Sequence, residues 1–244
     1  MKWFENWFDS KYYHILYQNR DNQEANLFIK NILTVLEPQQ DSQFLDLGCG
    51  SGRHSIQINK KGFHVDGVDL SKKSLEKAID YQNEKLKFYQ EDMRNINSIN
   101  KYDIVLNLFT SFGYFDNDKD HELVFQKIFK ALKNNGYFII DFFNAKKILK
   151  THPKHIFEKK ILNNILFEIE KNHDSQFIYK KIKITDGGKT YVYHEKVRLI
   201  TKQKFLNYFK NLKINLKSTY GDYHLNKYNS TSSDRLILIF QKNA

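Results

Sequence analysis

The first 145 residues alternate between short apolar runs and longer stretches in which apolar residues recur every three or four positions. Short apolar runs are typical of buried strands, and the wider spacing is typical of helices that bury one face. The runs predict strands at residues 44–47, 63–70, 87–90, 102–109 and 137–141, and the spacing predicts helices at 22–36, near 53, at 71–81 and at 118–132. Strands that alternate with helices favour an α/β fold with a doubly wound parallel sheet, in which ligands bind at the carboxyl ends of the strands.

After Asn144 the pattern changes to strict alternation of polar and apolar residues, at 164–171, 176–185 and 190–200. Such alternation predicts antiparallel strands, and Asp-Gly-Gly-Lys at 186–189 predicts the hairpin turn between two of them. A helix at 201–212 and strands at 214–219 and 235–241 complete the chain. We therefore expect a mostly parallel seven-stranded sheet with an antiparallel β insertion after the fifth strand.

Local signals refine two helices and the N-terminal segment. Ser71 is expected to cap the helix at 71–81, whose inward residues would be Leu75, Ala78 and Ile79, and Thr201 is expected to cap the helix at 201–212. The segment 3–20 is rich in aromatic residues: Trp3, Phe4, Trp7, Phe8, Tyr12, Tyr13 and Tyr17. Because each ring can bury roughly 150–250 Å², this segment is expected to fold back over the rest of the chain.

A glycine loop joins the first predicted strand to the helix that opens near Arg53. Gly48, Gly50 and Gly52 stand at alternate positions, so the backbone can turn sharply and come close to a ligand while N–H groups at the helix start face an anion. Asp69 ends the next strand about twenty residues downstream, where an acid can accept both hydroxyls of a ribose. The stretch at 44–71 therefore predicts a nucleotide-binding site.

The spacing of the glycines resembles one family in particular. A dinucleotide site would have its third glycine one residue later, whereas G-x-G-x-G, preceded by Leu-Asp-Leu at 45–47 and followed by Gly-Val-Asp-Leu-Ser at 67–71, resembles the first two motifs of class I S-adenosylmethionine-dependent methyltransferases. The resemblance implies that the helix start receives the methionine carboxylate, that Asp46 lies near the amino group, and that Asp69 holds the ribose.

The resemblance extends to a third motif and to the N-terminus. Glu-Asp-Met-Arg at 91–94 resembles the motif in which an acid, here Asp92, bonds the adenine amino group, and the tyrosine-rich segment resembles a lid over the cofactor. The candidate residues for binding S-adenosylmethionine, and its product S-adenosylhomocysteine, are Tyr13, Tyr17, Arg20, Asp46, Gly48, Cys49, Gly50, Gly52, His54, Asp69, Leu70, Asp92, Met93 and Asn107.

The resemblance also suggests how the chain is divided. Residues 1–36 would form the N-terminal lid and helix, and residues 37–145 together with 201–244 would form the Rossmann-like domain that binds S-adenosylmethionine. Residues 146–200 would form the antiparallel insertion, as a substrate cap or a dimer contact. Edge strands of the insertion could pair two copies of the chain into a homodimer.

Composition and charge bear on metal binding, on cellular location and on nucleic-acid binding. The single cysteine, Cys49, lies in the glycine loop, so the thiols of this chain cannot build a disulfide framework, a zinc site or an iron–sulfur cluster, and no metal is expected. An acid near the N-terminus and the absence of a long apolar stretch predict a cytoplasmic protein that does not span a membrane. Of the formal net charge of +11, +10 lies in residues 151–244, but the lysines are scattered along the strands, which favours solvated faces over a nucleic-acid surface.

The class of methyl acceptor is narrowed by excluding the classes whose characteristic residues this sequence lacks. The chain has only two prolines, Pro38 and Pro153, so the Asp/Asn-Pro-Pro-aromatic motif of amino-base methyltransferases is absent, and Asn-Leu-Phe-Thr at 107–110 occupies its place. Cys49 belongs to the cofactor loop, which excludes methylation of pyrimidine C5 by a cysteine nucleophile. A small-molecule N- or O-methyltransferase is expected. The alternatives are an RNA or protein methyltransferase and a nucleotide-binding regulator without turnover.

The loop at 109–115 follows the fourth strand, so it is expected beside the transferable methyl group. In amino-sugar methyltransferases, which this chain resembles here, the matching loop lines the acceptor pocket. Tyr114 is therefore the candidate catalytic residue that orients an amine or hydroxyl, with packing under the lid as the alternative role. His194 or His224 is the candidate proton acceptor.

Overall fold

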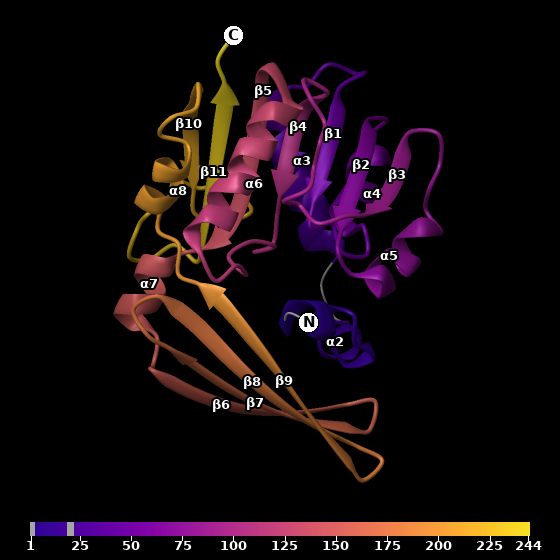
Figure 1. The fold of residues 1–244 in the computed structure, drawn as a ribbon, viewed down its shortest axis with the longest axis vertical. Helices are drawn as coiled ribbons and strands as arrows, with labels where there is room; N and C mark the ends of the chain where they lie inside the picture. The colour runs from indigo at the N-terminus through magenta and orange to yellow at the C-terminus, as the bar shows by residue number, and fades with distance from the viewer. Residues whose placement is uncertain (1–2, 19–21) are drawn as a thin grey trace.

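The computed structural model describes residues 3–18 and 22–244, and these form two β-sheets (Figure 1). The strands of the larger sheet are β1 Gln43–Leu47, β2 His64–Asp69, β3 Leu86–Gln90, β4 Tyr102–Asn107, β5 Leu132–Phe143, β10 Ile214–Tyr220 and β11 Arg235–Lys242. They lie in the order β10-β11-β5-β4-β1-β2-β3; β1 to β5 are parallel, and β11 and β10 are antiparallel to their neighbours. The predicted doubly wound, mostly parallel seven-stranded sheet is confirmed.

Helices cover both faces of this sheet. On one face α6 (Asp118–Ala131) and α8 (Lys202–Tyr208) pack against the sheet, and on the other α3 (Asn22–Leu36), α4 (Arg53–Asn59) and α5 (Lys72–Ile79) do so. Neighbouring residues of one strand serve opposite faces, because side chains alternate along a strand. In β5, for example, Phe138 and Ile140 belong to the first core and Ile139 to the second.

The second sheet is the predicted antiparallel insertion. Its strands are β6 His155–Leu162, β7 Ile165–His173, β8 Phe177–Asp186 and β9 Lys189–Arg198, in sequence order. The hairpin turn between β8 and β9 is confirmed: Gly187 and Gly188 have φ of 55° and 79°, the left-handed conformation that a tight hairpin turn requires.

The N-terminal helix pair, α1 (Trp3–Phe8) and α2 (Lys11–Leu16), lies between the two sheets, below the carboxyl ends of the parallel strands in Figure 1. Its apolar side chains pack on the insertion. Trp7, Tyr12 and Leu16 form a separate buried cluster with residues of β7 and β8, namely Ile165, Phe167, Ile169, Ile182 and Ile184. The aromatic segment therefore folds back onto the chain as predicted, with the insertion sheet supplying much of the surface that it covers.

Four sequence-based expectations were incomplete or wrong. The strand β6 and the helix α7 (Ala145–Thr151) were not predicted, because β6 is an edge strand with most of its residues exposed or half-buried and shows little apolar alternation. Ile79 is 48% exposed, so its predicted inward position is wrong; it lies at the last turn of α5, beyond the contact with the sheet. Strand β5 begins at Leu132 rather than 137, and α8 ends at Tyr208 rather than near 212. Ser71 and Thr201 cap their helices as predicted.

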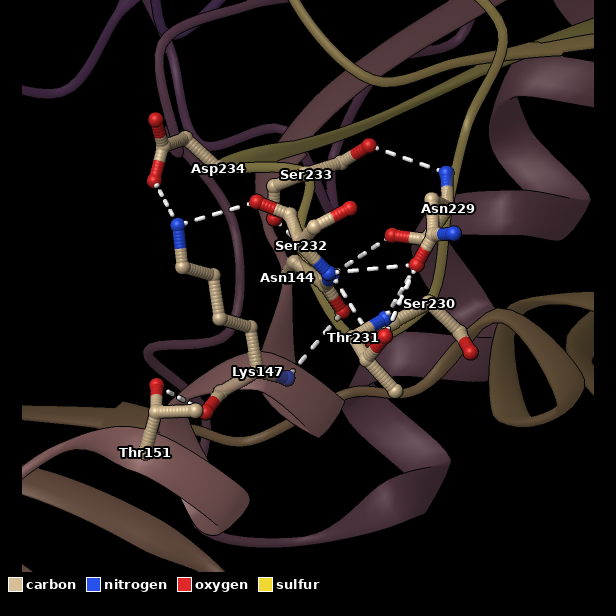
Figure 2. A network of polar contacts seen from close by, with 9 residues as sticks. All are labelled: Asn144, Lys147, Thr151, Asn229, Ser230, Thr231, Ser232, Ser233 and Asp234. Atoms are coloured by element: carbon tan, nitrogen blue, oxygen red, sulfur yellow. Dashed lines mark hydrogen bonds and ion pairs between the residues drawn. The ribbon is translucent and has the colours of Figure 1, made fainter.

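A polar network fixes the start of α7 to the loop before β11 (Figure 2). The buried side chain of Asn144 donates to the backbone carbonyl groups of Asn229, Ser230 and Ser233. Lys147 donates to the carbonyl oxygen of Ser232 at 3.0 Å. These bonds hold the loop against the start of α7 and so help to define where β11 begins.

One buried histidine supports the core beside the loop that follows β4. His121, on α6, is 0% exposed and lies among the rings of Phe112, Phe115 and Tyr208. Its Nδ1 donates to the carbonyl oxygen of Asn117, 2.9 Å away, and its Nε2 has no hydrogen-bond partner among the described residues. Burial lowers the pKa of His121 from 6.5 to about 4.

This burial predicts a pH-dependent stability term. Between pH 6.5 and about 4 the unfolded chain binds a proton that the folded chain does not, so the free energy of unfolding falls as the pH falls through this window. At 1.36 kcal/mol per pKa unit the term amounts to about 3 kcal/mol. In His121→Phe this term should be absent, so between pH 7 and 4 the wild type should lose about 3 kcal/mol relative to the variant in urea denaturation. The exposed His194→Phe is the control, and parallel curves for wild type and His121→Phe would contradict the prediction.

Candidate functional site

A cavity of about 1230 Å³ lies between the carboxyl ends of the parallel strands on one side and the N-terminal helix pair and insertion sheet on the other. Its walls come from the loop after β1, the ends of β2 and β3, the loop after β4, and the inner face of β8 and β9. Pockets for one drug-sized ligand measure roughly 300–1,000 Å³. The volume therefore gives room for two small molecules side by side.

The glycine loop forms one wall, and its three glycines serve different purposes. A Cβ at Gly50, where φ is +57°, would meet no atom within 4 Å, so it would project into the open cavity. A Cβ at Gly48 would lie 2.6 Å from the Cβ of Ser111, and one at Gly52 would lie 2.6 Å from the ring of Phe88. Gly50 therefore lets a ligand approach the backbone, whereas Gly48 and Gly52 allow close packing of neighbouring elements. Gly52 does not line the cavity.

Asp69 lies where the predicted ribose acid should lie. Its Oδ2 accepts from the N–H of Gly50 and its Oδ1 from the N–H of Ser71, both at 2.8 Å. Burial raises the pKa of Asp69, although the two backbone N–H groups act in the opposite direction. Since an ionised carboxylate offers about four acceptor positions, Asp69 keeps capacity to accept a further hydrogen bond in the cavity that it lines. Leu70, the next residue, also lines the cavity.

Asp46 occupies a different position from the one expected. It is 1% exposed, does not line the cavity, and accepts from the hydroxyl of Ser55 on α4 at 2.6 Å. Burial raises the pKa of Asp46 to about 6, against the lowering effect of the Ser55 hydrogen bond. Its observed contact joins β1 to α4 behind the glycine loop, and the structure does not bring it to the ligand side. Cys49 and His54 are both buried and both line the cavity.

Asp92 and Met93, just beyond β3, line the cavity as expected. The carboxylate of Asp92 is held by Arg94, whose Nη2 lies 2.5 Å from Oδ2 and whose Nε lies 3.0 Å from Oδ1. Arg94 also reaches Asp120 on α6 at 3.1 Å. The acid therefore has a fixed orientation at the end of the strand.

Asn107, the last residue of β4, lies behind the loops that meet above it. Its Nδ2 donates to the carbonyl oxygens of Leu47 and Ser111, and it is 1% exposed and does not line the cavity. Its Oδ1 is buried and has no hydrogen-bond partner among the described residues. A buried acceptor without a partner is costly in a folded protein. This oxygen lies next to the glycine loop, behind the cavity wall.

The loop after β4 is strained and held by a buried acid. Phe109 and Thr110 both have left-handed backbone, with φ of 57° and 63°, which costs roughly 1–2 kcal/mol for each residue with a side chain. Asp141 on β5 is 0% exposed and accepts from the N–H of Phe109 at 2.8 Å and from Nε of Arg235 at 2.7 Å. Arg235 also donates to the hydroxyl of Thr110 and lines the cavity. Strain of this kind is common at functional sites.

Tyr114 lies in the same loop and lines the cavity. Its hydroxyl donates to the carbonyl oxygen of Thr110 at 2.5 Å, and its ring contacts those of Trp3 and Phe8 on α1, with centroids 5.6 and 5.2 Å away. Both roles considered from the sequence are compatible with this position. The ring packs under the N-terminal helix pair, while a hydroxyl oxygen that donates one bond keeps capacity to accept another.

The two histidines proposed as proton acceptors do not reach the cavity. His194 is exposed on β9, and His224 is exposed in the loop before β11; neither lines the cavity. The inward residue of β9 at this point is Glu195, because adjacent side chains of a strand point to opposite faces. The structure thus corrects the assignment of His194 as a catalytic residue.

Tyr13 and Tyr17 line the cavity, and Arg20 lies outside the described residues. Tyr17 donates to Glu195 at 3.0 Å, and burial together with the Glu195 charge raises the pKa of Tyr17 to about 12. Glu195 and Lys180 on the insertion sheet also line the cavity and were missed. The alternation of side chains along β8 and β9 could have indicated these two residues. It does not, however, say which of the two alternating sets of side chains faces the cavity.

The described residues were also considered for metal-binding groups and membrane-spanning helices. Within residues 3–18 and 22–244, no three His, Cys, Asp or Glu side chains are grouped closely enough to hold a metal ion. In the same ranges no helix has both the length and the apolar character that crossing a bilayer requires.

Comparison with known proteins gives a family model and partial relatives. A model described as a methyltransferase domain matches residues 38–213. The YqeM protein of Bacillus subtilis (strain 168) is 32% identical over 121 residues, 48% of this chain and 49% of YqeM. A glycine/sarcosine N-methyltransferase of Halorhodospira halochloris is 29% identical over 138 residues, 54% of this chain and 50% of the relative. The chain thus spans about half the length of the curated relatives it matches.

Among solved structures, an S-adenosylmethionine-dependent methyltransferase from Clostridium acetobutylicum ATCC 824 resembles this chain with a TM-score of 0.80. The match covers 96% of each chain at 20% identity. Similarity at this level of identity establishes a shared fold, which here includes both the parallel sheet and the insertion.

Gly50 offers a direct test of the cavity. In Gly50→Val the side chain would occupy the space that a ligand needs, so calorimetric binding of S-adenosylhomocysteine should be lost. Gly187→Val is a matched control, because Gly187 has nearly the same φ, +55°, and equally open surroundings in a distant hairpin. It should suffer the same backbone strain and still bind. Equal binding by both variants, or tight NAD binding in place of S-adenosylhomocysteine, would refute this assignment.

Proposed function

Because this chain belongs to the methyltransferase-domain family and has the class I S-adenosylmethionine-dependent fold, we propose that it transfers the methyl group of S-adenosylmethionine to a nitrogen or oxygen atom of a small molecule. The observation that carries the proposal is the single large cavity that holds both the glycine loop and a second, aromatic half. One half fits the cofactor, and the other is enclosed by the insertion sheet and the N-terminal helix pair.

The residues of the first half fit S-adenosylmethionine. Asp69 would hold the ribose hydroxyls with its remaining acceptor capacity, and Asp92 would accept from the adenine amino group beside Met93. The open space at Gly50 admits the ligand close to the backbone. The unpaired Oδ1 of Asn107, behind the glycine loop, would accept a hydrogen bond from the methionine end, directly or through water.

The second half supports a small acceptor. It is walled by aromatic rings of the N-terminal helix pair and of the 109–115 loop, and by Lys180 and Glu195 from the insertion sheet. Enclosure on all these sides leaves room for a small molecule, which agrees with the substrates named for the glycine/sarcosine N-methyltransferase relative. The insertion would then act as the substrate cap.

The chain's own contribution is positioning. When bound, S-adenosylmethionine supplies a methyl group already activated as a sulfonium. Aligning an acceptor behind such a group can lower the barrier by roughly 7–11 kcal/mol. Phe109 and Tyr114 in the strained 109–115 loop, which Asp141 holds, line the cavity and would lie between the cofactor and the acceptor. Their rings exclude water, and the Tyr114 hydroxyl is placed to orient the acceptor atom.

The runner-up, an RNA or protein methyltransferase that uses the basic C-terminal half, has less support. Lys180 faces the cavity and pairs with Glu195 at 2.7 Å, and Lys183 pairs with Glu168 at 3.1 Å. Lysines engaged in this way release fewer counterions on binding phosphate than free ones would.

The test is a transfer assay with methyl-labelled S-adenosylmethionine and a panel of acceptors: glycine, sarcosine, amino sugars, small phenols, RNA and a total metabolite extract. We expect label in a small molecule and formation of S-adenosylhomocysteine, both absent in Gly50→Val. Transfer only to RNA in this panel, or only to protein when a protein extract is added as a further acceptor, would establish the runner-up. Binding of S-adenosylhomocysteine without transfer of label to any acceptor, including those in the extract, would indicate a nucleotide-binding regulator.

Tyr114→Phe separates orientation from packing, because it keeps the ring and removes only the hydroxyl. One lost hydrogen bond to the acceptor is worth about 1 kcal/mol, so turnover should fall about five- to tenfold while S-adenosylhomocysteine affinity stays unchanged. Tyr89→Phe, which alters an exposed residue outside the cavity, is the control. Wild-type turnover in Tyr114→Phe would assign the residue to packing alone.

A further inference from the structure

A buried carboxylate connects the N-terminal helix pair to the insertion sheet. Glu195 on β9 is 8% exposed. Its Oε1 accepts from the indole N–H of Trp7 at 2.7 Å and from the hydroxyl of Tyr17 at 3.0 Å, and its Oε2 lies 2.7 Å from the ammonium of Lys180. Lys180 in turn donates to the hydroxyl oxygen of Tyr17. Two donors come from the N-terminal segment and one from the insertion.

The hydrogen bonds of Glu195 are complete only while the segment stays in place, although its ion pair with Lys180 lies within the insertion sheet. Burial alone would raise the pKa of Glu195, but Lys180, Trp7 and Tyr17 together hold it below its ordinary value. If α1 and α2 moved away, Glu195 would lose both neutral donors, and Trp7, now 0% exposed, would lose its partner. Leaving a buried polar group unpaired is costly, so intermediate positions of the segment are disfavoured relative to closed and open ones.

The other contacts of the segment are the buried hydrophobic cluster of Trp7, Tyr12 and Leu16 on the insertion sheet and several more exposed polar contacts. Lys11 and Tyr12 both reach Asp186 at the hairpin, with the Lys11 side chain 63% exposed. On the Rossmann side, Asp9 accepts from Ser71 and from the N–H of Lys73. The rings of α1 also touch Tyr114 and Phe115. The cluster at Glu195 combines burial, a charged pair and two donors from the segment.

We propose that Glu195 is a positioning residue that latches the N-terminal helix pair onto the insertion sheet, and that release of this latch controls entry to and exit from the cavity. Glu195 acts through Trp7 and Tyr17. It holds the pair over the cavity, so the acceptor half is complete only when the latch is made.

The chain supplies its own reporter of the latch. It has two tryptophans, Trp3 and Trp7, and both lie in α1. Intrinsic tryptophan fluorescence therefore reports on this helix pair alone. Opening would expose Trp7, which shifts its emission to longer wavelength and makes it accessible to acrylamide.

The experiment compares wild type, Glu195→Gln, Glu195→Ala and Glu168→Gln. Glu168 also forms Glu–Lys pairs on this sheet, at β7, but with Lys159 and Lys183 and away from the cavity, so it is a matched control. Acrylamide quenching should increase from wild type to Glu195→Gln, which keeps an acceptor oxygen, and further in Glu195→Ala. Release of S-adenosylhomocysteine, followed by stopped flow, should accelerate about tenfold in Glu195→Ala, the factor expected from lost hydrogen bonds to a charged group.

The two readouts separate the latch from the proposed function. Quenching needs no ligand, so it tests the latch even in a protein that fails to bind S-adenosylhomocysteine. Quenching and release rates equal to those of Glu168→Gln, with circular dichroism unchanged, would overturn the proposal. Should Glu195→Ala not fold, Glu195→Gln alone decides between the same two outcomes.

Discussion

The cavity depends on the close approach of two loops at the point where the strand order of the large sheet reverses. In the sheet, β2 and β3 lie on one side of β1 and β4 lies on the other. The connections that follow β1 and β4 therefore lead away in opposite directions and leave a crevice above the point where the two loops meet. Gly48 and Ser111 meet at its base, where a Cβ on Gly48 would lie 2.6 Å from that of Ser111. The Ser111 hydroxyl donates to the Gly48 carbonyl, and Asn107 donates to both loops. Glycine at 48 is thus a packing requirement, although Gly48 and Gly50 both line the cavity.

The second half of the cavity depends on a different constraint, the buried carboxylate of Asp141. A carboxylate at 0% exposure needs strong partners, and Asp141 finds them in Phe109, Tyr223 and Arg235, which are far apart in sequence. Arg235 begins β11, whose position follows from the network around Asn144. The antiparallel end of the sheet therefore has a role at the cavity: Arg235 supplies the charge that pairs with Asp141, and Asp141 holds the strained loop in the cavity wall.

The accuracy of the sequence-based predictions follows the range of the interactions involved. The glycine loop, the Ser71 cap and the Gly187-Gly188 turn are local structures, and the residue types in each favour one backbone conformation. Each of them was therefore predicted from the sequence. The latch residues were missed because Trp7 and Glu195 are 188 positions apart. On β9 the adjacent residues His194 and Glu195 are both polar, so the alternation of the strand cannot say which of them faces inward. His194 was selected from the sequence, whereas Glu195 faces inward in the structure. The contact of Asp46 with Ser55 was not predicted, because a motif defines a residue's neighbours in sequence and not the direction of its side chain.

These differences separate the site into two parts with different origins. The cofactor half is built from contiguous motifs between residues 44 and 93, so its geometry is established by short loops at the ends of adjacent parallel strands. The acceptor half is built from residues 3–17 packed on residues 165–197, through a hydrophobic cluster that shares no buried residue with the two cores of the large sheet. Substitutions in that cluster can alter the shape of the acceptor pocket while the glycine loop keeps its contacts, because distant sites without shared partners act independently. If the proposed function holds, the acceptor is selected by the part of the chain whose contacts span the largest sequence separations, and short sequence motifs do not reveal such contacts.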